Sequence, residues 1–107
     1  MTGPFVRNFP AVDAGGGVTR KVVADSPELM VVEFRFSEGG VGALHNHPHV
    51  QSTYVKSGRF EFTIGDNTFE IGPGDGLVVP SMVTHGCRAL EAGTLVDTFT
   101  PRRDDFL

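Results

Sequence analysis

Short apolar runs with a period of two, separated by turn-forming residues, make up most of this chain. Within residues 29–36, Val32 and Phe34 alternate with Glu33 and Arg35, which is typical of a strand that buries one face. Similar alternation or short apolar runs predict further strands over residues 59–64, 68–71, 77–79 and 95–100. No segment shows a convincing helical periodicity.

Glycine and proline residues lie between these runs and supply the turns. Gly65, Asp66 and Asn67, for example, offer the positive-φ positions of a hairpin. Many short strands at this spacing favour an all-β fold, either an antiparallel sandwich or a small barrel, and periodicity alone does not choose between them. With nine Phe and no Trp, we expect a narrow interior that is filled mainly by side chains and has space for one small ligand.

Composition narrows the classes of function. The 107 residues suit a single domain over residues 1–107. The formal net charge of −4 lacks the basic surface of a nucleic-acid binder, so we expect no nucleic-acid partner. Neither a signal peptide nor a long apolar segment is recognisable, and the single Cys87 allows no intramolecular disulfide. We therefore expect a cytoplasmic protein with no membrane partner.

The candidate chemistry centres on His45, His47, Gln51 and His85. One residue separates His45 from His47, so the two imidazoles would point from the same face of a strand. A second strand could bring Gln51 alongside them, and a third could bring His85 across. The four side chains would then offer neutral ligand atoms to one divalent ion and leave room for a substrate.

Two further polar residues stand out. His49 follows Pro48, which interrupts the strand ladder, so the direction of the His49 side chain stays open. Asp97 lies on the same face of its predicted strand as Leu95 and Phe99, which puts a carboxylate in line with apolar residues. It is either a hydrogen-bonded or edge-exposed aspartate, or a general base near the metal whose pKa is set by burial beside the cation.

The spacing of these residues resembles the two motifs of the cupin family. The first motif, Gly-x5-His-x-His-x3-Glu-x6-Gly, is matched in every spacing by Gly39, His45, His47, Gln51 and Gly58, with glutamine in place of glutamate. The second, Gly-x5-Pro-x-Gly-x2-His-x3-Asn, is matched by Gly74, Pro80 and His85, whereas Met82 and Ala89 replace its second glycine and its asparagine. The resemblance covers residues 29–100 and implies a small antiparallel double-stranded β-helix, the cupin jelly-roll barrel, with a metal ion inside.

The glutamine changes the expected chemistry of the metal. A shell of three histidines and Gln51 carries no negative charge, so a bound divalent ion keeps its full charge and is a stronger Lewis acid towards oxygen. Redox iron sites usually include a carboxylate, so this shell favours polarising a carbonyl, enol or hydroxyl, and it attracts anionic substrates. Nickel, zinc, manganese, cobalt and iron all suit these ligands, and the sequence does not select among them.

Nearly the whole chain also resembles a narrower group, the small single-domain cupins of the KdgF type that are associated with pectin and alginate breakdown. This resemblance rests on residues 45–51, 57–62 and 93–101, followed by Arg103, Asp105 and Phe106. It implies a metal-dependent isomerase-type enzyme. The implied reaction converts 4,5-unsaturated monouronates, which are anionic sugars, to the linear keto-aldehyde form.

The resemblance also implies roles for individual residues. The metal ligands would fall on His45, His47, Gln51 and His85, and the active-site aspartate, phenylalanine and arginine on Asp97, Phe99 and Arg103. Arg103 would bind the substrate carboxylate, Phe99 would pack on the sugar, and Asp97 would move a proton between the anomeric hydroxyl and the enol carbon. Arg102 competes with Arg103 for the carboxylate, and Cys87 is either a buried inert thiol or a group near the site.

Two other classes of function compete with this interpretation. One is a non-catalytic sugar-binding or sensory cupin, and the other is a cupin oxygenase or a polyketide-type cupin enzyme. Exposed sheet edges and the resemblance to the family further predict a homodimer.

Overall fold

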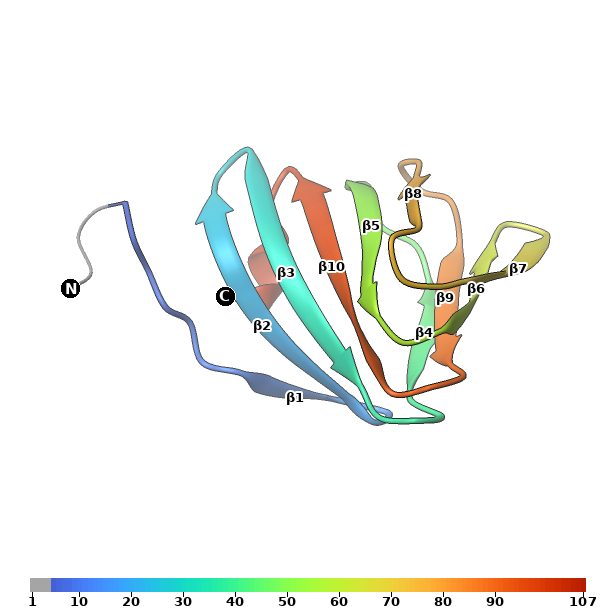
Figure 1. Cartoon of the computed structure of the whole chain (residues 1–107). Coiled ribbons are helices and arrows are strands. Elements are labelled where there is room, and N and C mark those ends of the chain that lie inside the picture. Colours follow the sequence, from blue (N-terminus) through green and yellow to red (C-terminus); the bar gives the residue numbers. More distant parts are fainter. Residues whose placement is uncertain (1–4) are drawn as a thin grey trace.

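The computed structural model describes residues 5–107, which form two facing antiparallel sheets (Figure 1). The six-stranded sheet contains, in spatial order, β1 (Val12–Gly15), β2 (Val18–Ser26), β3 (Leu29–Phe36), β10 (Gly93–Thr100), β5 (Val50–Ser57) and β8 (Gly76–Val79). The four-stranded sheet contains β4 (Val41–His45), β9 (His85–Ala89), β6 (Phe60–Ile64) and β7 (Asn67–Ile71). The predicted all-β, jelly-roll fold is confirmed. Within residues 5–107, no helix has the length and apolarity needed to cross a membrane.

The centre of the larger sheet sets the positions of the buried polar side chains. Strand β10 lies between β3 and β5, and its alternation buries Leu95, Asp97 and Phe99 on the inner face. The register with β5 places Asp97 beside Thr53 and Phe99 beside Gln51. Paired residues of neighbouring strands point to the same face, so these four side chains form a compact patch inside the sandwich.

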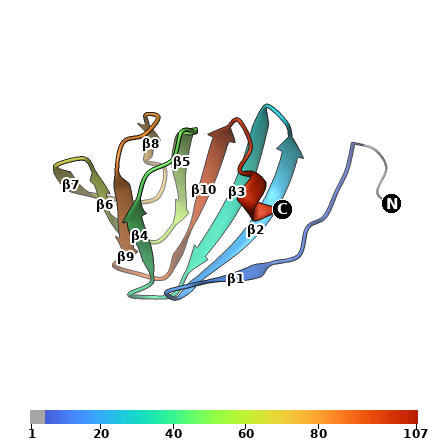
Figure 2. The ribbon, with the colours of Figure 1, turned by 180° about the vertical axis from the view of Figure 1, so that it is seen from behind.

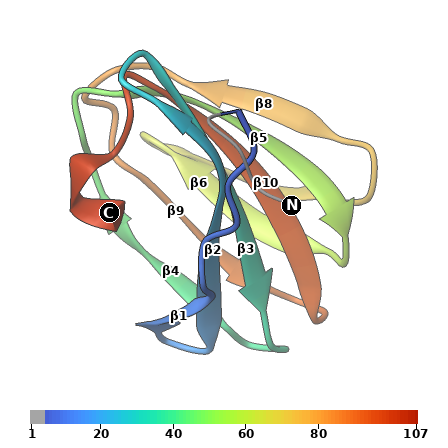
Figure 3. The same ribbon diagram turned by 90° about the vertical axis from the view of Figure 1, so that its left-hand side faces the viewer.

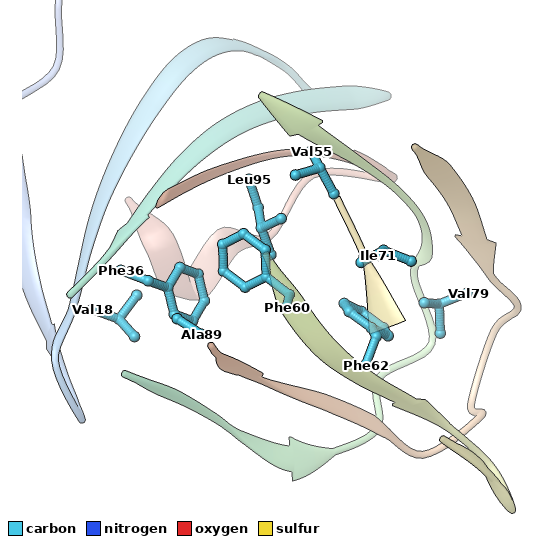
Figure 4. Packing of buried hydrophobic residues seen from close by; sticks show 9 residues of the cluster. All are labelled: Val18, Phe36, Val55, Phe60, Phe62, Ile71, Val79, Ala89 and Leu95. Carbon is cyan, nitrogen blue, oxygen red and sulfur yellow. The ribbon is translucent and has the colours of Figure 1, made fainter. Parts of the chain in front are cut away.

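The apolar core lies on both sides of this polar patch. The larger cluster fills the space between the sheets and includes Val18, Phe36, Val55, Phe60, Phe62, Ile71, Val79, Ala89 and Leu95 (Figure 4). The smaller cluster consists of Val22, Met30, Val32 and Phe99. Along β10, Leu95 belongs to the first cluster and Phe99 to the second, with Asp97 between them. Packing on either side therefore holds the aspartate in place.

The C-terminal segment returns over the inner face of the larger sheet. It ends in one 3-10 turn, η1 (Asp104–Phe106), which lies against β2 and β3 in the view from behind (Figure 2). The ring of Phe106 meets Phe34 and Phe99 edge-on, with centroid distances of 6.0 Å and 5.8 Å. These contacts place the end of the chain against the inner face of β3 and β10.

The glycine-rich turn between β1 and β2 contacts the start of β4, in the smaller sheet (Figure 3). The backbone nitrogen of Val41 donates to the carbonyl oxygen of Gly16 at 2.8 Å. A Cβ atom on Gly16 would lie 2.8 Å from the carbonyl oxygen of Val41, so only glycine allows this approach.

Gly58, the last glycine of the first cupin motif, has a comparable constraint between β5 and β6. Its φ is +82°, and an added Cβ would lie 2.7 Å from both the carbonyl oxygen of Ala92 and the Cα of Gly93. Gly65, in the β6–β7 turn, also has a positive φ of +56°, but a Cβ there would meet nothing within 4 Å. Comparing substitutions at the two glycines therefore separates the cost of backbone strain from the cost of steric overlap.

We predict that Gly58→Ala destabilises the protein more than Gly65→Ala. The Gly65 variant should cost about 1 kcal/mol for left-handed backbone strain alone. The Gly58 variant should cost at least ~1 kcal/mol more, because two backbone segments must also move apart. Urea unfolding followed by circular dichroism measures both, and equal losses for the two variants would contradict this account of Gly58.

Candidate functional site

Three histidines converge at one end of the smaller sheet, and two of them, His47 and His85, are buried while His45 is exposed. His45 ends β4 and His85 begins β9, and the two residues are paired in the sheet register. His47 comes from the segment between β4 and β5. Ligand atoms of His45, His47 and His85 all lie within 4.8 Å of one another, close enough to hold a metal ion.

The path of the chain to this cluster differs from the sequence expectation. We expected His45 and His47 to point from the same face of one strand, but β4 ends at His45. His47 reaches the cluster through its loop, where its carbonyl oxygen accepts a hydrogen bond from the backbone nitrogen of Met82 at 2.8 Å. The spacing of the motif is preserved because the loop, and not strand alternation, turns the second ring inward.

Backbone carbonyl groups fix the orientation of each ring. The Nδ1 atoms of His45, His47 and His85 lie 2.8, 3.0 and 2.9 Å from the carbonyl oxygens of Ala43, His49 and Val83. Each Nδ1 therefore carries the proton and donates it, which leaves the lone pair of Nε2 for a ligand. Burial lowers the pKa of both His47 and His85, so these rings are neutral at pH 7, as metal binding requires.

Gln51 completes the cluster from β5, in the opposite sheet. Its Oε1 lies 3.0 Å from Nε2 of His47 and 3.1 Å from Nε2 of His85. Its amide nitrogen donates to Thr53 Oγ1 at 3.0 Å and to Asp97 Oδ2 at 3.2 Å, which turns the oxygen towards the histidines. All of the converging atoms are thus acceptors. Acceptors this close repel one another unless a cation lies among them, so the side chains present fit a divalent metal ion.

Asp97 lies next to this cluster with one oxygen free. Among the residues that the structure describes, its buried Oδ1 has no hydrogen-bond partner. Burial raises the pKa of Asp97 to about 7, against the opposing effects of the Thr53 side chain and the positive charge of Arg103. A carboxyl group with a pKa near neutrality can both accept and donate a proton at physiological pH.

A cavity of about 470 Å³ opens onto these groups. Its polar lining includes His45, Gln51, His85, Asp97 and Arg103. Its apolar lining includes Phe34, Phe36, Phe62, Leu95, Phe99 and Phe106. The cavity is large enough for a monosaccharide, and an arginine, a carboxylate and three of the four candidate metal ligands line it.

The two neighbouring arginines take different positions. Arg103 lines the cavity, and its guanidinium carbon lies 5.3 Å from the ring centroid of Phe99. Arg102 instead pairs with Asp25 at 3.5 Å and with Asp104 at 3.0 Å. The structure therefore brings Arg103 to the candidate site and uses Arg102 to attach the C-terminal segment to β2.

The remaining sequence candidates lie at the edge of the site. His49 is outside the histidine cluster, and its Nε2 lies 3.2 Å from the carbonyl oxygen of Arg102. Cys87 lines the cavity, but burial raises its pKa to about 12, so it stays a thiol. Sequence reasoning missed Thr53, although its shared parity with Gln51 on β5 was a signal that it faces the same side.

The chain is similar to known proteins over most of its length. A family model described as "Cupin domain" matches residues 32–98. The pectin degradation protein KdgF of Dickeya dadantii (strain 3937) is 38% identical over 100 residues, covering 92% of this chain and 91% of that protein.

Solved structures have the same fold. An RmlC-like cupin from Shewanella frigidimarina superposes with a TM-score of 0.90 at 36% identity, covering 92% of this chain and 89% of that chain. KdgF from a Halomonas species superposes with a TM-score of 0.88 at 41% identity, covering 92% of this chain and 93% of that chain.

The raised pKa of Asp97 predicts a pH-dependent effect of Asp97→Asn on the metal-free protein. Between the ordinary value of 3.8 and about 7, the unfolded chain ionises while the folded protein keeps its proton, so wild-type stability falls across this range. The amide of the variant does not titrate. The free energy of unfolding of the variant, relative to that of the wild type, should therefore rise with pH, on the scale of ~1.4 kcal/mol per unit of pKa shift.

Urea unfolding in the presence of a chelator at pH 5 and pH 8 measures this difference. Asp66→Asn makes the same chemical change at an exposed carboxylate in the β6–β7 turn and serves as the control. A stability difference for Asp97→Asn that is the same at both pH values would contradict the assigned pKa shift.

Proposed function

This chain belongs to the cupin family and is KdgF-like over nine-tenths of its length, and from this we propose that it linearises 4,5-unsaturated monouronates in pectin or alginate breakdown. The observation that carries the proposal is the content of one cavity. It combines a cluster of acceptors suited to a metal ion, a carboxylate with a free oxygen, and an arginine. These are the groups that an anionic sugar with a hemiacetal and an enol ether requires.

The metal would be held by His45, His47, His85 and Gln51, and would supply a Lewis acid towards a substrate oxygen. None of the four side chains is a carboxylate, since three are imidazoles and Gln51 is an amide, so they would not neutralise the charge of the ion. The positive charge at the site therefore favours an anionic substrate.

Arg103 and Phe99 would bind the sugar. The guanidinium can pair with the substrate carboxylate through two parallel hydrogen bonds. The ring of Phe99 lies beside Arg103 and lines the cavity, so it is placed to pack against one face of the sugar. Together they would fix the distance between the substrate carboxylate and the reacting carbons.

Asp97 would transfer the proton. Its free Oδ1 accepts the proton of the anomeric hydroxyl as the bond from C1 to the ring oxygen breaks and the aldehyde forms. The electron pair of that bond passes through the ring oxygen and the C4–C5 double bond to C4, and C5 becomes a ketone. C4 then takes the same proton from Asp97. The sum is an isomerisation that needs no outside proton, oxidant or reductant.

Two further predictions from the sequence stay proposals, namely a single domain over residues 1–107 and a homodimer. Size-exclusion chromatography with light scattering measures the oligomeric state directly.

We predict that turnover depends on a divalent ion. Purified protein should open the ring of an unsaturated galacturonate or mannuronate monomer faster than the spontaneous rate, as followed by NMR. Treatment with chelator should return the rate to the spontaneous value, and nickel, zinc, manganese, cobalt or iron should restore the accelerated rate.

Ring opening that is not accelerated would overturn the proposed function. Binding without turnover would favour a sugar-binding cupin, and oxygen consumption with bound iron would favour an oxygenase.

We predict that Asp97→Asn lowers kcat by at least ~10²-fold, the usual size of a lost general acid–base group. Metal content should be unchanged, because Asp97 does not belong to the histidine cluster and an asparagine oxygen can still accept the hydrogen bond from Gln51 Nε2. Asp66→Asn removes an exposed carboxylate from the β6–β7 turn and serves as the matched control. Full activity of the Asp97 variant would remove this residue from the reaction.

A further inference from the structure

The side chain of Arg103, which lines the cavity, is held on two sides. Its Nε and Nη2 atoms donate to Oδ1 and Oδ2 of Asp105 at 3.0 Å and 2.9 Å. Its guanidinium carbon lies 4.3 Å from the ring centroid of Phe106 and 5.3 Å from that of Phe99. The arginine side chain is 13% exposed, whereas that of Asp105 is 61% exposed.

This pairing leaves one edge of the guanidinium available. The group has five N–H donors, and the side-on contact with Asp105 uses one on Nε and one on Nη2. The adjacent end of the guanidinium still presents two parallel N–H groups, one on Nη1 and one on Nη2. That end matches a second carboxylate in a bidentate pair.

We propose that Asp105 is a positioning residue, which holds Arg103 side-on so that the Nη1/Nη2 end of the guanidinium receives the carboxylate of the sugar substrate. The inference rests on the proposed function, because it assigns the substrate carboxylate to Arg103. Because the Asp105 carboxylate is largely exposed to solvent, the ion pair contributes little to folding stability, and its effect lies in the geometry of the arginine.

The charge of Asp105 has the opposite effect on binding. A carboxylate beside Arg103 partly neutralises it and repels the substrate carboxylate. If Asp105 acted mainly through charge, its removal would strengthen substrate binding. If it acts by orientation, its removal weakens binding, because an arginine free to rotate must be ordered by the substrate. The sign of the change in KM therefore distinguishes the two effects.

Asp104 provides a matched control in the neighbouring position. Its Oδ1 accepts a hydrogen bond from Nε of Arg102 at 3.0 Å, and its side chain is 84% exposed. Asp104→Asn and Asp105→Asn make the same chemical change one residue apart. Only Asp105 contacts the arginine that lines the cavity. An amide keeps the shape of the aspartate but presents a donor where the guanidinium needs an acceptor.

The experiment compares the kinetics of wild type, Asp104→Asn and Asp105→Asn with an unsaturated galacturonate monomer. Asp105→Asn should raise KM roughly tenfold with little change in kcat, because it affects substrate positioning and not proton transfer. Asp104→Asn should leave both constants within about twofold of wild type. Adding Asp105→Asn to Arg103→Ala should have no further effect, because the two residues act as one unit.

An NMR measurement tests the positioning without substrate. The Nε–H signal of Arg103 should exchange slowly with solvent in wild type and in Asp104→Asn, and rapidly in Asp105→Asn. An active wild type whose KM is unchanged or lowered by Asp105→Asn would overturn this inference alone. An inactive wild type with a protected Nε–H would overturn the proposed function, and the substrate role of Arg103 with it, while the Asp105 contact would stand.

Discussion

The antiparallel pairing of β5 with β10 is the constraint on which the candidate site depends. Its register places Gln51 beside Phe99, Thr53 beside Asp97, and Val55 beside Leu95. Because strand side chains alternate with a period of two, a shift by one residue would turn the polar groups to the outer face of the sheet. Val55 and Leu95 belong to the main apolar core, so the packing that stabilises the fold also maintains the geometry of the polar groups.

The amide of Gln51 joins the two halves of this site. Its oxygen faces His47 and His85, and its nitrogen donates to Thr53 and Asp97. A glutamate in the same position would set a second carboxylate oxygen against Asp97, and the two groups would repel each other. Glutamine therefore has two effects. It keeps the ligand cluster uncharged, and it donates a hydrogen bond to the carboxylate that we propose as the proton carrier.

Much of the site could be identified from the sequence, for reasons that are local. The alternation over residues 29–36 and 95–100 predicts strands that the structure confirms as β3 and β10. The same parity argument placed Asp97 on an inner face, where it is buried. The argument was wrong where the strand ends. It assigned His45 and His47 to one strand, whereas a loop that contains Pro48 carries the second ring to the cluster.

The sequence by itself determined the strand periodicity, the motif spacing and the types of side chain that could hold a metal, because these follow from backbone geometry over a few residues. Only the tertiary structure decided that Arg103 lines the cavity while Arg102 pairs with Asp25. It also showed that Gln51 donates a hydrogen bond to Asp97 and that Arg103 donates one to Asp105. Two adjacent arginines have the same local sequence pattern, so the sequence does not show which of them lines the cavity. Their different positions depend on how the C-terminal segment packs against β2 and β3, which are far away in the sequence.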